Sequence, residues 1–221
     1  MSQLNLTNDE LLSTTRAVRK RLDFDRPVPK EVLLECLSIA LQAPSGSNAQ
    51  EWQFMFVTDQ AKKDRIAELY RDEFEKYVQG PASPTAQEGL SEQDQQVQNR
   101  VASSAQYLAD NLARVPVLFI PCISPRTDSP GMPGSSILHA SILGSIIPAA
   151  WSFMLAARAR GLGTCLTTLH LMKERETARI LSIPYDSVMQ VGLIPVAYTL
   201  GTDFKPGPRR PLDPIVHFEE W

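Results

Sequence analysis

The sequence has few of the residues that build metal sites. Its 221 residues include only three cysteines and three histidines. Cys36, Cys122 and Cys165 are scattered and form no Cys-x-x-Cys pair, and the histidines show no zinc-binding spacing. We therefore expect no metal site, and we expect buried, reduced thiols with a structural role.

The chain also lacks the short motifs that present a nucleophile or bind a dinucleotide. It contains no Gly-x-Ser-x-Gly turn, and no close His–Asp or His–Cys pair can be assigned. Gly161-Leu162-Gly163 has no third glycine after it, and residues 164–169 favour a strand where a dinucleotide fingerprint requires a helix. His139, His170 and His217 could each donate a proton, although a structural role is the simpler interpretation. The sequence thus offers no catalytic residue of its own.

Charge of one sign is not concentrated anywhere. The net charge is −3, with no basic block or acidic tail, which argues against a nucleic-acid partner. A hydrophobic content of 43% is ordinary for a soluble globular protein, and residues 1–221 suit one domain. The first residues show no basic region followed by an apolar core, so no secretory signal is visible and we expect the cytoplasm as location.

One long stretch, residues 137–157, is nearly uncharged and approaches transmembrane length. His139, Pro148 and several serines argue against a membrane span, so we expect no membrane partner and a helix inside the protein. Ala140, Gly144 and Pro148 recur every four residues, as do Ser141 and Ser145. Such rows of small residues let helices approach closely, either in a core or at a subunit interface.

Apolar periodicity and breaker residues predict a chain dominated by helices, with three or four strands between them. A capping box at residues 7–10 starts a helix that we expect to reach Arg19. The other predicted helices span residues 30–42, 61–78, 92–114, 137–157 and 173–181, and the predicted strands span 52–58, 115–123, 164–169 and 191–199. Residues 80–92 form a long loop, either mobile or a lid. The tail from residue 205 has four prolines and several apolar residues, so we expect it to pack on another surface.

Two short segments offer ligand-binding chemistry. Arg16 and Arg19 are three residues apart, and could be a solvated basic helix end or a pair of cations for a phosphate and a polarised carbonyl. Pro44 ends a helix, and Ser45-Gly46-Ser47-Asn48 follows with small donors around a flexible backbone. This turn is either an ordinary connector or a surface that presses N–H groups against a flat polar ligand.

Four segments, in this order along the chain, resemble the FMN-dependent nitroreductase family. They are residues 15–22 (TRAVRKRL), residues 44–52 (PSGSNAQEW), the Gly161-Leu162-Gly163 end of the apolar helix, and residues 209–212 (RRPL). The resemblance covers nearly the whole chain. It implies an α+β nitroreductase-type fold with a mixed central sheet flanked by helices. It also implies an intertwined homodimer with FMN at the subunit interface, in which the extension at residues 205–221 embraces the partner.

The resemblance also implies which residues contact the cofactor. The positions that match are Arg16, Ala17, Arg19, Pro44, Ser45, Gly46, Asn48, Thr167, Thr168, Leu169, Arg209 and Arg210. Arg16 and Arg209, with Arg210 as a weaker candidate, match the phosphate-binding positions, and Arg19 matches the position beside the flavin N1–C2 carbonyl edge. Residues 44–48 match the family's turn, which is often given to the other subunit's flavin, and residues 167–169 match the segment whose backbone faces the flavin N5 region.

Two residues depart from the family pattern. Ala17 stands where the family has a serine, so one hydroxyl contact is missing, and a backbone N–H could replace it. Glu51 stands where the family has a proline, and its carboxylate either shapes substrate preference or faces water.

The activity that the resemblance implies is hydride transfer from NADPH or NADH through FMN. The acceptor would be a nitroaromatic, a quinone or a related electron-poor molecule, reduced in ping-pong fashion over one flavin face. Two alternatives stay open: another chemistry of the same family (reductive dehalogenation, enone reduction or flavin fragmentation), and a protein that stores or senses FMN without turnover.

Overall fold

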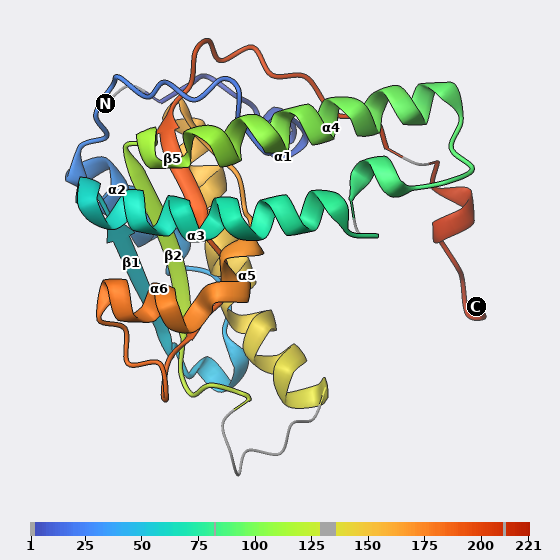
Figure 1. Ribbon diagram of the computed structural model, residues 1–221. Coiled ribbons are helices and arrows are strands. Elements are labelled where there is room, and N and C mark those ends of the chain that lie inside the picture. The colour runs from blue at the N-terminus through green and yellow to red at the C-terminus, as the bar shows by residue number, and fades with distance from the viewer. Residues whose placement is uncertain (1–2, 82, 129–135, 210) are drawn as a thin grey trace.

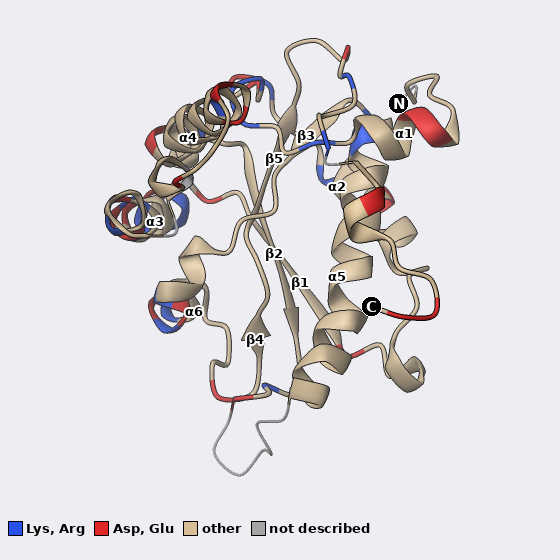
Figure 2. Ribbon diagram, turned by 90° about the vertical axis from the view of Figure 1, so that its right-hand side faces the viewer, with Lys and Arg blue, Asp and Glu red and all other residues tan. Residues whose placement is uncertain are grey.

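The structure is a computed structural model that describes residues 3–81, 83–128, 136–209 and 211–221. A five-stranded sheet lies between two layers of helices (Figures 1 and 2). The strand order is β1-β2-β5-β3, and a short β4 also pairs with β2. The strands are β1 Trp52–Val57, β2 Val117–Ile123, β3 Leu162–Thr164, β4 Met189–Gln190 and β5 Ile194–Tyr198. These strands pair antiparallel, and an isolated parallel bridge joins Ala17 to Thr164 beside β3.

Helices cover both faces of the sheet. Figure 2 shows α3 Gln60–Gln79, α4 Glu92–Asn111 and α6 Glu174–Leu181 on one face, and α2 Lys30–Ala40 and α5 Ser136–Ala159 on the other. The helix α1 Asn8–Thr14 packs near the C-terminal end of α5. Short 3-10 segments lie at Gly46–Asn48, Pro84–Ala86, Leu112–Arg114, Leu169–Lys173 and Asp213–Ile215.

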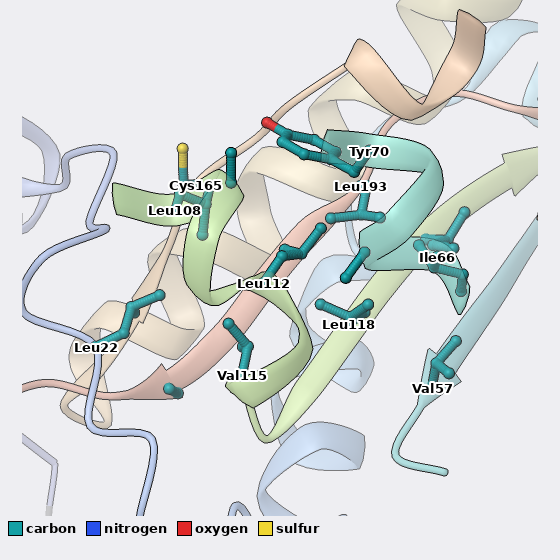
Figure 3. Close-up of a cluster of buried hydrophobic side chains, with 14 of the residues drawn as sticks. Leu22, Val57, Ile66, Tyr70, Leu108, Leu112, Val115, Leu118, Cys165 and Leu193 are labelled. Atoms are coloured by element: carbon teal, nitrogen blue, oxygen red, sulfur yellow. The ribbon is translucent and has the colours of Figure 1, made fainter. Parts of the chain in front are cut away.

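The sheet separates two apolar cores, because its middle strands are buried on both sides. All seven residues of β2 are buried. On one face, Ile66 of α3 and Leu108 of α4 pack against Leu118 and Leu193 (Figure 3). On the other face, the ring of Phe153 lies 4.3 Å from that of Phe119, measured between centroids, and α2 completes this core.

The sequence predicted most helices within two or three residues of their observed ends, and it predicted the first one wrongly. Thr7 caps α1 in a capping box as expected, but the helix ends at Thr14, so Arg16 and Arg19 are not in its last turn. The hydroxyls of Thr14 and Thr15 donate to carbonyls four residues earlier, and Thr15 turns to an extended conformation. Tertiary pairing with β3 then holds the following residues extended.

The strand predicted at residues 164–169 is also mostly wrong. Only Leu162–Thr164 forms a strand, and a single bridge from Thr167 to Leu193 precedes the 3-10 segment at Leu169. Gly161 has a φ of 75° and is the left-handed residue that follows the long helix. The two-residue strand β4 was not predicted.

The small-residue rows of α5 divide between core and surface. Ser145 is buried, whereas Ala140, Ser141 and Gly144 are exposed on the side that faces away from the sheet. Among the described helices, α5 has the length and hydropathy needed to cross a membrane, and 44% of its apolar window is buried in this chain. It contacts α2, β2 and β3 along its buried side, as a core helix does.

The three cysteines are free and buried, as the sequence predicted. Burial raises the pKa of Cys36 to about 11 and that of Cys122 to about 12, so both remain thiols at neutral pH. Burial also raises the pKa of Cys165, although the neighbouring Arg19 opposes the shift.

Candidate functional site

The segment that follows α1 is clamped against β3. The amide of Val18 donates to the carbonyl oxygen of Thr164 over 2.8 Å, next to the bridge from Ala17 to Thr164. Gly163 makes this approach possible, because a Cβ there would lie 2.9 Å from Val18 Cγ1 and 2.7 Å from Thr199 Cγ2. The local sequence therefore fixes Arg16 and Arg19 on either side of an anchored Val18.

A cavity of about 420 Å³ lies where this segment, the C-terminal tail and α4 meet. We call it the arginine cavity. Its lining residues are Arg16, Ala17, Arg19, Val97, Arg100, Val101, Ser104, Pro208 and Arg209. The structure thus brings together four of the residues that the sequence predicted, from segments almost 200 residues apart in the chain. Figure 2 shows lysines and arginines gathered between α4 and α1, at this end of the sheet.

The arginine cavity is strongly cationic. Four of its lining residues are arginines and none is acidic. Within the described part of the chain, none of these four makes a salt bridge, and the bonds found for them run to neutral oxygens: Lys205 O for Arg16, Ser104 Oγ for Arg19, Gln96 O for Arg100 and Pro208 O for Arg209. Each guanidinium carries five N–H donors, so most of their hydrogen-bonding capacity is free for an anion.

The tail and the N-terminal segment meet at Gly207. A Cβ at this residue would lie 2.7 Å from Arg209 Nη1 and 3.5 Å from Arg16 Nη2, so both guanidinium groups lie close to Gly207. These are the two residues that the resemblance assigns to a phosphate. Arg210, the weaker candidate, lies outside the described residues.

Helix α4 supplies four lining residues that the sequence did not identify as site residues. Val97, Arg100, Val101 and Ser104 are spaced i, i+3, i+4 and i+7, so they share one face of the helix. The two valines look like ordinary core residues of an amphipathic helix, and Arg100 looks like a solvated charge. The only feature of the sequence that could have marked this helix face as part of a binding site is the polar pair Arg100 and Ser104 within the apolar stripe.

The predicted segment at residues 167–169 lies close to Arg19. The amides of Thr167 and Leu193 each donate to the other's carbonyl oxygen. Tyr70 of α3 is buried, which raises the pKa of its hydroxyl, and the neighbouring Thr167 side chain opposes the shift. Arg19 adjoins both Tyr70 and Cys165, and Figure 3 shows these two at one edge of the core. Thr168 itself is exposed.

The turn after α2 has a strained backbone. Ser47, Asn48 and Gln50 have φ values of 52°, 54° and 51°, a region that residues other than glycine seldom adopt. Ser145 of α5 holds this turn: its hydroxyl accepts from Gly46 N at 2.9 Å, and its carbonyl accepts from Trp52 Nε1 at 3.0 Å. Strain that the surroundings enforce is common where a backbone contacts a ligand. Glu51 is exposed and so faces water, one of the two outcomes considered for it.

The strained turn and the arginine cavity lie at different points along α5, the turn near its middle and the cavity near its C-terminal end. The turn bonds Ser145, whereas Arg158, near the C-terminal end of the helix, donates to Thr14, two residues before Arg16. We call residues 15–19 the arginine segment. Ser145 and Arg158 are thirteen positions apart, a separation of roughly 20 Å at the rise of an α-helix. A single chain therefore does not unite the two predicted groups of site residues.

Comparisons with known proteins agree with the fold and with the predicted family. The model of the family described as "Nitroreductase family" matches residues 12–198. A protein of Methanothermobacter thermautotrophicus named "Putative NADH dehydrogenase/NAD(P)H nitroreductase" is 25% identical over 96% of this chain and 86% of its own length. A BluB-like flavoprotein from Clostridium difficile 630 superposes with a TM-score of 0.70 at 16% identity, covering 98% of this chain and 100% of that one.

An oxidised iodotyrosine deiodinase bound to FMN and 3-iodo-L-tyrosine superposes with a TM-score of 0.66 at 23% identity, covering 96% of this chain and 98% of that one. At such identities the solved structures establish the shared fold alone. The family assignment rests on the match over most of the sequence. The chain belongs to the nitroreductase family.

Proposed function

We propose that this protein is an FMN-dependent oxidoreductase that takes hydride from NADPH or NADH and reduces nitroaromatics, quinones or related electron-poor acceptors. The observation that carries the proposal is the arginine cavity, with four arginines, no acidic lining residue and no salt bridge in the described part of the chain. The names of the relatives support the same chemistry, since one is described as an NAD(P)H nitroreductase and a structural neighbour holds FMN.

The residues present fit the phosphate group of FMN. A phosphate monoester carries nearly two negative charges at neutral pH and offers three acceptor oxygens. Arg16 and Arg209 present adjacent planar guanidinium groups with free donors, which suits bidentate binding of such a group. In the proposed arrangement these two residues hold the phosphate.

Arg19 has a different place and a different proposed role. It is half-buried, beside the neutral thiol of Cys165 and the neutral hydroxyl of Tyr70. A cation in such partly dry surroundings acts strongly on nearby negative charge. When bound, FMN supplies the hydride chemistry, and Arg19 would stabilise the charge that develops at the flavin N1–C2 edge on reduction.

We also propose that a second copy of the chain completes the site. The outward side of α5 presents Ile137 at 80% exposure and Trp151 at 41%, along with Ala140, Ser141 and Gly144. The tail adds Leu212, Ile215, Phe218 and Trp221, all exposed, and Figure 1 shows it leaving the body and ending clear of the sheet. Apolar surface of this extent favours a partner. In a dimer, the strained turn of one chain can reach the cofactor held by the other chain's arginines.

Reductive dehalogenation is the second candidate, because the chain shares its fold with a deiodinase that binds an iodinated phenol. Turnover with 3-iodotyrosine and with a nitroaromatic, compared at equal flavin loading, separates the two activities. Dehalogenation predicts release of iodide with the first substrate and slow reduction of the second.

The test of the main proposal is a spectrum followed by two additions. Purified protein should show flavin absorbance, and the released cofactor should be FMN. NADPH or NADH should bleach the bound flavin, and menadione should restore the oxidised spectrum within the mixing time. Protein that takes up no flavin from added FMN contradicts the proposal, and protein that holds FMN but is not reduced by either donor is a binding protein instead.

A further inference from the structure

Arg100 on α4 has no role in the proposed function. The proposed function assigns Arg16 and Arg209 to the phosphate and Arg19 to the flavin ring. Arg100 lines the same cavity from the opposite wall, together with Ser104 one turn further along α4. Its Nε donates to the carbonyl oxygen of Gln96 in its own helix, and no other bond is found for it among the described residues.

The charge balance of the cavity favours an anion beside Arg100. Four guanidinium groups share one cavity of about 420 Å³ without a carboxylate in its lining. Like charges at such separations repel, and a group that binds among them relieves that repulsion. Arginine keeps its charge at any physiological pH, so the cavity cannot lower the repulsion by losing a proton.

The site also has room for a third arginine at a phosphate. Three terminal oxygens provide more acceptor positions than two bidentate arginines use. Arg16 and Arg209 approach from the N-terminal segment and the tail, whereas α4 forms the other wall of the same cavity. Arg19 and Lys20 already join this wall to the N-terminal segment, because they donate to Ser104 Oγ and Ser103 Oγ. This anchoring keeps Arg100 at the cavity.

We propose that Arg100 is a third ligand of the FMN phosphate, so that α4 closes the cofactor site from the side opposite the tail. This inference rests on the proposed function, since it needs FMN in the arginine cavity. It adds a helix that the sequence motifs do not include, and it makes cofactor affinity depend on the α3–α4 hairpin as well as on the two ends of the chain.

Binding of FMN and of riboflavin, which lacks the phosphate, tests the assignment. Dissociation constants are measured by quenching of flavin fluorescence for the wild type, Arg100→Ala, Arg100→Lys and Arg65→Ala. Arg65 is an exposed arginine on α3 outside the cavity, so its replacement matches the change in net charge. Arg100→Ala should weaken FMN binding about ten- to hundredfold and leave riboflavin binding unchanged. Arg100→Lys should recover part of the loss, and Arg65→Ala should change neither constant.

The same measurements show which idea fails if the result differs. Unchanged FMN affinity in Arg100→Ala, or equal losses for FMN and riboflavin, overturns the role of Arg100 alone. A raised KM for 4-nitrobenzoate but not for nitrobenzene, with FMN affinity intact, would assign Arg100 to an acidic substrate and also overturn it. A wild type that does not prefer FMN to riboflavin overturns the phosphate site as a whole. Alanine is a strong helix former at this exposed position, so the variant should keep its fold.

Discussion

Arg16 and Arg19 are neighbours in sequence but occupy different surroundings. Arg16 is exposed, lies beside Arg209 and donates to the tail at Lys205 O. Arg19 is half-buried, donates to Ser104 and lies near enough to Cys165 and Tyr70 to lower the pKa of both groups. Because Val18 between them is anchored, the side chain of Arg16 lies at the outer edge of the cavity and that of Arg19 lies closer to the core. This separation is the physical basis for giving them different tasks.

Alanine at each position should separate cofactor affinity from reduction potential. Arg16→Ala should weaken FMN binding by about 1.5–3 kcal/mol, the size of a hydrogen bond to a charged group. It should hardly move the midpoint potential, because the phosphate carries the same charge in both redox states. Arg19→Ala should lower the potential more than it lowers the affinity for oxidised FMN. The paired measurement is FMN affinity and midpoint potential for both variants, and equal shifts in potential would contradict the assignment.

His170 provides a second test at the residue scale, because it is fully buried and neither ring nitrogen has a hydrogen-bond partner among the described residues. Burial lowers its pKa to about 4, well below the value of an exposed histidine. Between about pH 6.5 and 4, the unfolded chain therefore binds a proton that the folded chain excludes. The contribution to folding stability from keeping His170 neutral is fully present above this pH window. It is lost as the pH falls through the window.

His170→Gln should reduce the acid sensitivity of folding. The difference in free energy of unfolding between pH 7 and pH 4.5 should be smaller in the variant than in the wild type, by up to about 2 kcal/mol. Urea unfolding at the two pH values measures it. Equal differences in the two proteins would show that His170 does not titrate in this window, whatever the variant does to stability at pH 7.

At the scale of elements, the close contact between β3 and the arginine segment controls the site. Gly163 is the residue that permits it. Gly163→Ala would push Val18 and Thr199 apart, and we expect a loss of stability of about 1–3 kcal/mol together with weaker FMN binding. Gly80→Ala is the matched control, since a Cβ there meets its nearest atoms at 3.4 Å and 3.5 Å. Thermal unfolding and FMN titration of both variants make the comparison, and a Gly163→Ala protein with unchanged affinity would mean that the segment is not positioned by this contact.

The sequence predicted elements well where local signals were sufficient. Helices α2 to α6 and strands β1, β2 and β5 follow from apolar periodicity and breaker residues such as Pro29 and Pro184. The prediction failed where pairing with a distant segment decided the conformation, as at Arg16–Arg19 and at residues 165–169. The two-residue strand β4 exists because its backbone pairs with β2, and no local sequence pattern predicts it.

For the candidate site as well, local motifs predicted some residues, and tertiary packing brought in others that the sequence did not reveal. Arg16, Arg19 and Arg209 were predicted because each belongs to a motif, and the structure places all three in one cavity. Arg100 and Ser104 reach that cavity only through the packing of α4 on the core, which the local pattern does not reveal. The strain at Ser47 and Asn48 was also missed, because the sequence predicted only a flexible backbone across residues 45–48, and the positive φ values fall on residues other than Gly46.

At the scale of the whole molecule, the proposal of a dimer rests on the exposed apolar surface of α5 and of the projecting tail. Gly144 is exposed on α5, and a Cβ there would meet nothing within 4 Å in this chain. Gly144→Leu should therefore fold normally as a single chain but should block the close approach of a second copy. Sedimentation should show a monomer with little bound flavin, whereas Ala61→Leu, an added side chain at an exposed position of α3, should remain dimeric and yellow. A dimeric, yellow Gly144→Leu protein would place the interface elsewhere.

The exposed side of α5 also bears on what a melting temperature would mean for this protein. If a second copy covers that side, folding and association share one equilibrium, and dilution draws it toward separate chains by mass action. The same protein would then melt at a lower temperature in a dilute sample than in a concentrated one, and added FMN would offset part of the difference. Its resistance to heat would be set by its concentration as much as by its sequence.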